Sequence, residues 1–68
     1  MFMSLAEHIK AKRKKFGLTQ VELAERASVG LRFVREMEQG KKTLRMDKVN
    51  KVLALFGEAL VPDRVKVL

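Results

Sequence analysis

The fold is decided by residues 18–40, which read LTQVELAERASVGLRFVREMEQG. Thr19 and Glu22 form the T-x-x-E pattern of a capping box, which marks the start of a helix. Residues 28–30 (Ser-Val-Gly) are typical of a short turn, and a second helix is expected over residues 31–39. Helices joined by so short a turn cross steeply and need small residues where they meet. Their shared core is expected from Leu23, Ala24, Ala27, Val29, Val34 and Met37.

One further helix is expected on each side of this stretch. Ser4 and Glu7 form a second capping box, and Gly17 ends the first helix. The last helix is expected to begin at residues 45–46 and to end at Gly57. Apolar spacing predicts that the inward-facing side chains are Leu5, Ile9 and Phe16 in the first helix, and Met46, Val49, Val52 or Leu53, and Phe56 in the last.

The C-terminal tail has a different pattern. Pro62 prevents a continuous helix, and residues 64–67 alternate between polar and apolar, which predicts a β-strand. The chain has no second strand for it to join, so antiparallel pairing with the same tail of a second copy is expected, centred on residues 59–61. The predicted dimer interface consists of Leu55, Ala59, Leu60 and Val61. The expected fold is therefore all-α, a four-helix domain over residues 1–57 followed by a tail, 58–68, whose short strand pairs across a homodimer.

Composition narrows the function. The 68 residues form one small domain, and 15 Lys and Arg against 8 Asp and Glu give a net charge of +7. This charge favours a polyanionic partner, nucleic acid before an anionic membrane. No cysteine and a single histidine, His8, predict no metal site, no cofactor and no enzymatic activity. No apolar run reaches the roughly 18 residues of a membrane span, and the start lacks a signal peptide's apolar region, so a cytoplasmic, nucleoid-associated protein is expected.

The helix pair has the geometry of a helix-turn-helix, whose second helix enters the DNA major groove. Arg32, Arg35 and Glu36 are expected on its outer face, with Gly30 and Leu31 at its N-terminal end. Lys41 and Lys42 follow this helix and are expected near phosphates. The basic run over residues 10–15 is expected near the DNA backbone, although a simple solvated face is the alternative.

The L-T-Q-x-E-L-A pattern over residues 18–24, together with E-x-G-K over 38–41, resembles the Xre/lambdoid-repressor helix-turn-helix family. The resemblance covers residues 8–57. It implies a lambda-repressor-like fold and a homodimer that binds a palindromic double-stranded DNA operator. It places Gln20 and Gln39 at phosphates, Gly30, Leu31, Arg32, Arg35 and Glu36 at base edges, and Arg13 and Glu38 in an ion pair beneath the motif.

Three positions depart from the family pattern. Ser28 stands where family members commonly have glycine, and a left-handed backbone there would cost about 1 kcal/mol. Leu31 replaces a polar base reader and can contact only a thymine methyl group. Phe33 replaces a small polar residue and is expected in packing rather than as a base-contacting wedge. Direct base reading is therefore expected to depend mainly on Arg32 and Arg35. Glu36 has two alternative roles, either contacting a base or forming a salt bridge with a neighbouring Lys or Arg.

The length, the missing fifth helix and the strand-like tail resemble HipB-type antitoxins, which are small dimeric repressors that neutralise a HipA-family kinase toxin. The sequence therefore predicts a transcriptional repressor that is also the antitoxin of a HipBA-type toxin–antitoxin system. Two alternatives stay open. One is a protein-interaction module with weak DNA contact, and the other is a phage or restriction-modification controller.

Overall fold

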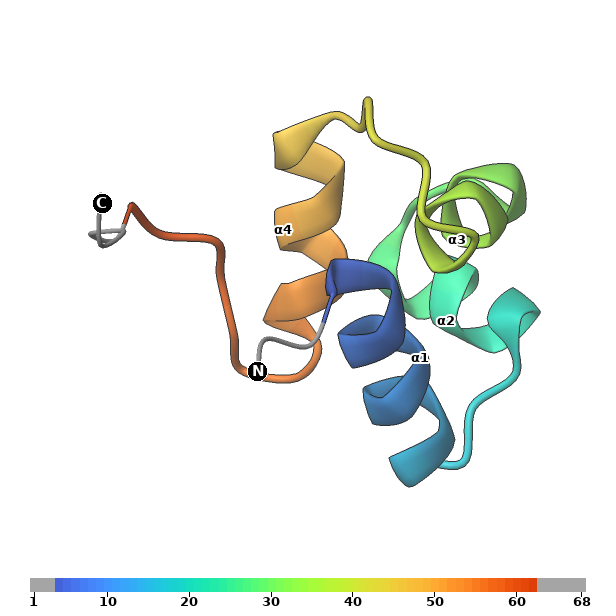
Figure 1. The fold of residues 1–68 in the computed structure, drawn as a ribbon. Helices are drawn as coiled ribbons and strands as arrows, with labels where there is room; N and C mark the ends of the chain where they lie inside the picture. The colour runs from blue at the N-terminus through green and yellow to red at the C-terminus, as the bar shows by residue number, and fades with distance from the viewer. Residues whose placement is uncertain (1–3, 63–68) are drawn as a thin grey trace.

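The computed structural model describes residues 4–62, which form four helices and no strand (Figure 1). The helices are α1 (Leu5–Lys15), α2 (Gln20–Ala27), α3 (Leu31–Glu38) and α4 (Met46–Ala54). α3 packs against α1 and α2, and α4 packs against α2. The predicted all-α, four-helix domain is confirmed for this part of the chain.

The first two helices begin at side-chain caps. Thr19 has a complete capping box: its hydroxyl accepts the Glu22 N–H at 3.1 Å, and the Glu22 carboxylate accepts the Thr19 N–H at 2.9 Å. At Ser4 only one half of the predicted box is present, since the hydroxyl accepts the Glu7 N–H at 3.2 Å. The Glu7 carboxylate instead accepts the Ser4 hydroxyl proton at 2.9 Å. Both helices nevertheless begin where the sequence predicts.

All four helices end in a Schellman motif, in which a residue with positive φ turns the chain. These residues are Gly17, Ser28, Gly40 and Gly57. The N–H of the residue after each one donates to the carbonyl five residues earlier, at 3.0–3.1 Å. Ser28 is the non-glycine in this position, with φ of 56°. The left-handed turn expected at Ser28 is therefore present, with its steric strain.

The core lies between the four helices, and its buried members are Ile9, Leu18, Leu23, Ala24, Ala27, Val34, Met37, Val49, Val52 and Leu53. Two predicted core positions are wrong. Met46 is 64% exposed, because it is the first residue of α4 and Leu44 packs against the core instead. Phe16 follows the last residue of α1 and is half exposed, with its ring edge-to-face on Phe56 at 5.1 Å.

The tail leaves the helices on the side of α4 (orange to red in Figure 1). The strand pairing predicted around residues 59–61 is not supported, because residues 58–62 have no strand and the Leu60 N–H donates to Asn50 Oδ1 at 2.7 Å. An amide used in this way is not free to pair with another strand. The strand predicted at residues 64–67 lies outside the described residues.

Candidate nucleic-acid interface

On the outer face of α3, Arg32 in the first turn opposes the helix dipole, whereas Arg35 in the last turn complements it. Gly30, the N-cap of α3, offers no side-chain hydrogen bond, and the first turn contains no acidic residue. Arg32 lies in that first turn with its side chain 92% exposed, and Arg35 is exposed as well. Free N–H groups and a cation at a helix N-terminus favour an anionic partner. This end of α3 is therefore suited to contact a polyanion.

An exposed cluster of three charged residues, Arg32, Glu36 and Lys41, occupies this face. Glu36 Oε1 accepts a hydrogen bond from Arg32 Nε at 3.2 Å, and Oε2 accepts one from Lys41 Nζ at 3.1 Å. The hydrogen bond from Lys41, followed by the one from Arg32, lowers the pKa of the Glu36 carboxyl below its ordinary value. Of the two roles considered for Glu36, the structure shows the salt bridge.

The other predicted DNA contacts of this region lie along α3, at its ends and in the loop after it. Gly30 and Gln39 are exposed at the two ends of α3, and Lys42 is exposed in the loop that follows. Leu31 is half-buried and packs partly against the core. Phe33 also packs against the core, as expected, and Lys48 Nζ lies 5.8 Å from its ring centre.

Beneath this face, Arg13 and Glu38 form a bidentate ion pair. Arg13 Nε donates to Glu38 Oε2 at 2.7 Å and Nη2 donates to Oε1 at 3.0 Å, while Nη1 donates to the Leu18 carbonyl at 2.9 Å. The side chains are only 12% and 4% exposed. The hydrogen bond with Glu38 raises the pKa of Arg13 despite its burial. The pair joins α1, the following turn and α3.

Gln20, expected at a phosphate, lies at the first position of α2 and is half-buried. Its Nε2 donates to Glu38 Oε1 at 3.3 Å. The amide of Gln20 therefore contacts the Arg13–Glu38 ion pair, which restricts the position of its side chain. The L-T-Q pattern gives the position of Gln20 but no signal for this contact.

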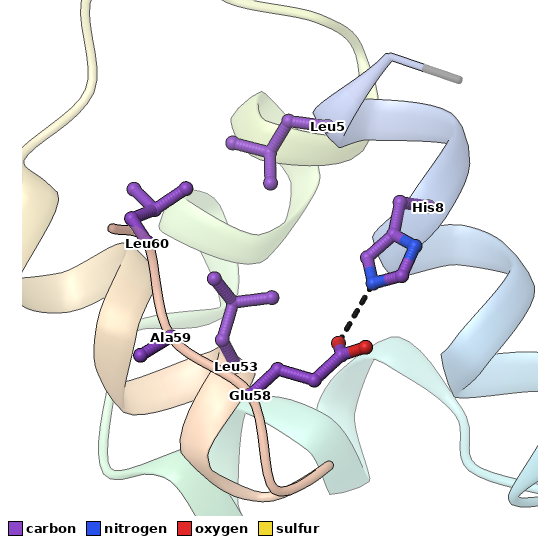
Figure 2. Close-up of a pocket in the computed structure, with 6 residues that line it drawn as sticks. All are labelled: Leu5, His8, Leu53, Glu58, Ala59 and Leu60. Carbon is purple, nitrogen blue, oxygen red and sulfur yellow. Dashed lines mark hydrogen bonds and ion pairs between the residues drawn. The ribbon is translucent and has the colours of Figure 1, made fainter. Parts of the chain in front are cut away.

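A second polar site lies between α1 and the start of the tail. His8 Nε2 and Glu58 Oε1 are 2.7 Å apart, and Lys12 Nζ lies 3.8 Å from Glu58 Oε2. Figure 2 shows this pair beside a pocket lined by Leu5, His8, Leu53, Glu58, Ala59 and Leu60. The hydrogen bond with His8 lowers the pKa of Glu58. Sequence reasoning missed this contact because its partners are 50 positions apart. Lys12, one of the lysines of the basic run, therefore lies next to a carboxylate.

Among residues 4–62, no group of three or more His, Asp or Glu side chains is arranged to hold a metal ion. None of the helices in this part of the chain has the length and apolar character needed to cross a bilayer.

Comparison with known proteins agrees with this geometry. The HTH-type transcriptional regulator y4mF of Sinorhizobium fredii (strain NBRC 101917 / NGR234) is 49% identical over 45 residues. The matched stretch covers 66% of this chain and 59% of the relative, so it spans less than two thirds of that protein. A family model described as helix-turn-helix matches residues 9–61. That match covers well over half of the chain and includes α2, α3, α4 and the larger part of α1, so the chain belongs to the helix-turn-helix family.

Proposed function

We propose that the chain is a sequence-specific DNA-binding transcriptional repressor that acts by binding and not by catalysis, in the cytoplasm at the nucleoid. The observation that carries the proposal is the outer face of α3, with an uncapped N-terminus, Arg32 in the first turn and Arg35 exposed. A net charge of +7 supports a polyanionic partner. The name of the y4mF relative, an HTH-type transcriptional regulator, agrees with this function.

In this proposal, base edges and phosphates are contacted by different residues. Arg32 and Arg35 read bases, since arginine can donate two hydrogen bonds to guanine. Leu31 is limited to a thymine methyl group, and Glu36 reaches a cytosine only by leaving its salt bridges. The residues proposed at phosphates are Gln20, Gln39, Lys41 and Lys42, and Gly30 lets the backbone approach the groove.

We also propose that the repressor is a homodimer on a palindromic operator. Leu55, Leu60 and Val61 are large apolar side chains exposed near the end of the domain, and Ala59 is exposed beside them. A two-fold partner would remove this surface from water. Side-chain packing is the proposed basis of the interface, since the Leu60 N–H is already bonded. Two copies of α3 about 34 Å apart would then reach successive major grooves.

An antitoxin role in a HipBA-type system is the more specific part of the proposal. The sequence resemblance supports it, and the exposed apolar side chains of the tail offer a surface for a HipA-family kinase toxin as well as for the dimer. Co-expression with the kinase-like product of an adjacent gene should give a complex that survives size-exclusion chromatography. A chain with Leu60→Asp and Val61→Asp should lose it.

A salt series on duplex DNA tests the main proposal. Because each neutralised phosphate releases counterions, log K should fall linearly with log salt, with a slope of about −0.9 per phosphate contact. Replacing Lys42 with alanine should reduce the slope by about one contact. If the chain binds no duplex at low salt, the protein-interaction alternative gains support and the repressor proposal fails. A phage or restriction-modification controller would bind DNA in the same way, and its neighbouring genes would distinguish it.

A further inference from the structure

We infer that Glu36 is a positioning residue for base reading: it fixes Arg32 so that the arginine can recognise guanine, without contacting a base itself. The inference rests on the proposed DNA binding and adds to it a residue that determines specificity. It also distinguishes Arg32 from Arg35, which sequence reasoning treats as equivalent readers.

The contact between Arg32 and Glu36 uses an atom of Arg32 that is not needed to recognise guanine. Arg32 donates to Glu36 through Nε, at 3.2 Å. Within residues 4–62, neither terminal amino group of Arg32 makes a hydrogen bond to protein. Guanine O6 and N7 accept two parallel hydrogen bonds from an arginine fork. A guanidinium held at Nε therefore keeps both terminal groups for the base while losing freedom of rotation.

Glu36 is itself held in place. Its second oxygen accepts a hydrogen bond from Lys41 Nζ at 3.1 Å, and its side chain is only 27% exposed. Lys41 follows the turn at Gly40, so the carboxylate is fixed from outside the helix. Arg32, in contrast, is 92% exposed and depends on this carboxylate for its orientation.

Stability does not explain the pair. An acidic residue four positions after a basic one is the weaker orientation for a helical ion pair. Arg32 in the first turn and Glu36 in the last turn both oppose the helix dipole of α3. A pair this exposed adds little to folding. The arrangement is unfavourable for an isolated helix and favourable for presenting a cation to a partner.

Arg35 provides the internal comparison. It is exposed on the same helix, and no ion pair of its side chain is found in the part of the chain that the structure describes. Its guanidinium is not fixed by a neighbouring carboxylate. We therefore assign the sharper guanine preference to Arg32.

Selection from a pool of random duplex DNA tests this assignment, with the full-length chain and its Arg32→Ala, Glu36→Ala, Glu36→Gln and Arg35→Ala variants. Arg32→Ala should lose one guanine position, with a fall in discrimination of about 5- to 150-fold. Glu36→Ala should relax the same position by about two- to fivefold, the effect of an exposed pair. Glu36→Gln should retain the preference, because its amide oxygen can still accept the Nε–H of Arg32. Arg35→Ala should leave that position unchanged.

Two results would overturn the inference while leaving the repressor proposal intact. One is a guanine preference in Glu36→Ala equal to that of the parent. The other is that both Glu36 variants bind every sequence more tightly than the parent and by the same factor. That result would mean that Glu36 only lowers the positive charge of the surface. If the parent selects no sequence and binds no duplex at low salt, the proposed function fails and the inference falls with it. Circular dichroism melts of each variant confirm that the fold is kept.

Discussion

Two arginine–glutamate ion pairs, formed within residues 4–62, lie in different surroundings. Arg13 and Glu38 meet through two hydrogen bonds in a largely buried position, with the Leu18 carbonyl and Gln20 amide completing their bonding. Arg32 and Glu36 meet through one hydrogen bond at the surface. Removing one partner of the Arg13–Glu38 pair leaves the other charge largely buried without a counterion. Removing one partner of the Arg32–Glu36 pair leaves a charge that water can hydrate. The comparison shows that burial, and not residue type, decides whether such a pair supports the fold or remains available to a partner.

Both acids belong to α3. Glu36 and Glu38 are two positions apart, and residues at this spacing do not share a helix face. One short helix therefore presents one carboxylate to the interior and another to the proposed DNA surface. Separate variants of the two ion pairs should show how completely these two functions are separated.

The largest effect is expected from Glu38→Ala. Removing one partner of a buried pair costs about 3–5 kcal/mol, because the Arg13 guanidinium is left uncompensated. A domain of this size has only about 3–5 kcal/mol of stability, so the loss is comparable to the whole stability and a substantial fraction of the variant should be unfolded at room temperature. Far-UV circular dichroism melts measure this, with Glu36→Ala on the same helix as the matched control. A Glu38→Ala midpoint within about a degree of the parent would contradict the structural role of the pair, since 1 kcal/mol moves the midpoint by about 4–8 °C.

Arg32→Ala should show the reverse behaviour. Its thermal midpoint should match the parent, because the side chain is exposed and its pair contributes little to folding. Its discrimination between the selected site and random DNA should fall by about 1–3 kcal/mol. Fluorescence anisotropy with both duplexes at one salt concentration measures the ratio. An equal loss of affinity for both duplexes would make Arg32 a phosphate contact and remove the contrast with Arg13.

The sequence predicts the helices better than it predicts the contacts. Capping residues and glycines act locally, so the starts at Ser4 and Thr19 and the turn at Ser28 can be read from neighbouring residues. The resemblance to a known family supplied the positions of Arg13 and Glu38, which spacing alone does not reveal. Their ion pair depends on how α1 and α3 pack.

Contacts that depend on distant packing escaped prediction. His8 meets Glu58 only because the tail folds back across α1 and α4. Helical periodicity predicts Met46 in the core, but Met46 is exposed and the loop residue Leu44 packs against the core. The tail pattern predicts strand pairing centred on residues 59–61, whereas the side chain of Asn50 bonds the Leu60 amide. A side chain that bonds a distant backbone group leaves no periodic signal in the sequence.

Ser28→Gly tests the turn that sets the angle between α2 and α3. The left-handed conformation costs a non-glycine residue about 1 kcal/mol, and glycine removes this cost. Part of the gain is offset because glycine has greater conformational freedom in the unfolded chain. A net stabilisation of about 0.5 kcal/mol should raise the midpoint by about 2–4 °C. DNA discrimination should stay the same, because Ser28 lies before α3. The control is Gly17→Ala: a Cβ there meets no atom within 4 Å, so its expected loss of stability reports backbone strain alone.

The smallest effect concerns the pH dependence of the exposed cluster. Bonds from Lys41 and Arg32 lower the pKa of Glu36 from its ordinary 4.5, so the folded state favours the ionised carboxylate. A carboxyl group with a lowered pKa stabilises the fold above its ordinary pKa, and that contribution disappears as the pH falls through the lowered value. The parent should therefore melt slightly above Glu36→Gln near pH 6, and the two midpoints should converge in acid. Paired melts from pH 6 to pH 2 isolate this group, since every other carboxyl titrates in both proteins. A midpoint difference that grew in acid would mean that Glu36 is not held by its cations, and the proposed positioning of Arg32 would lose its anchor.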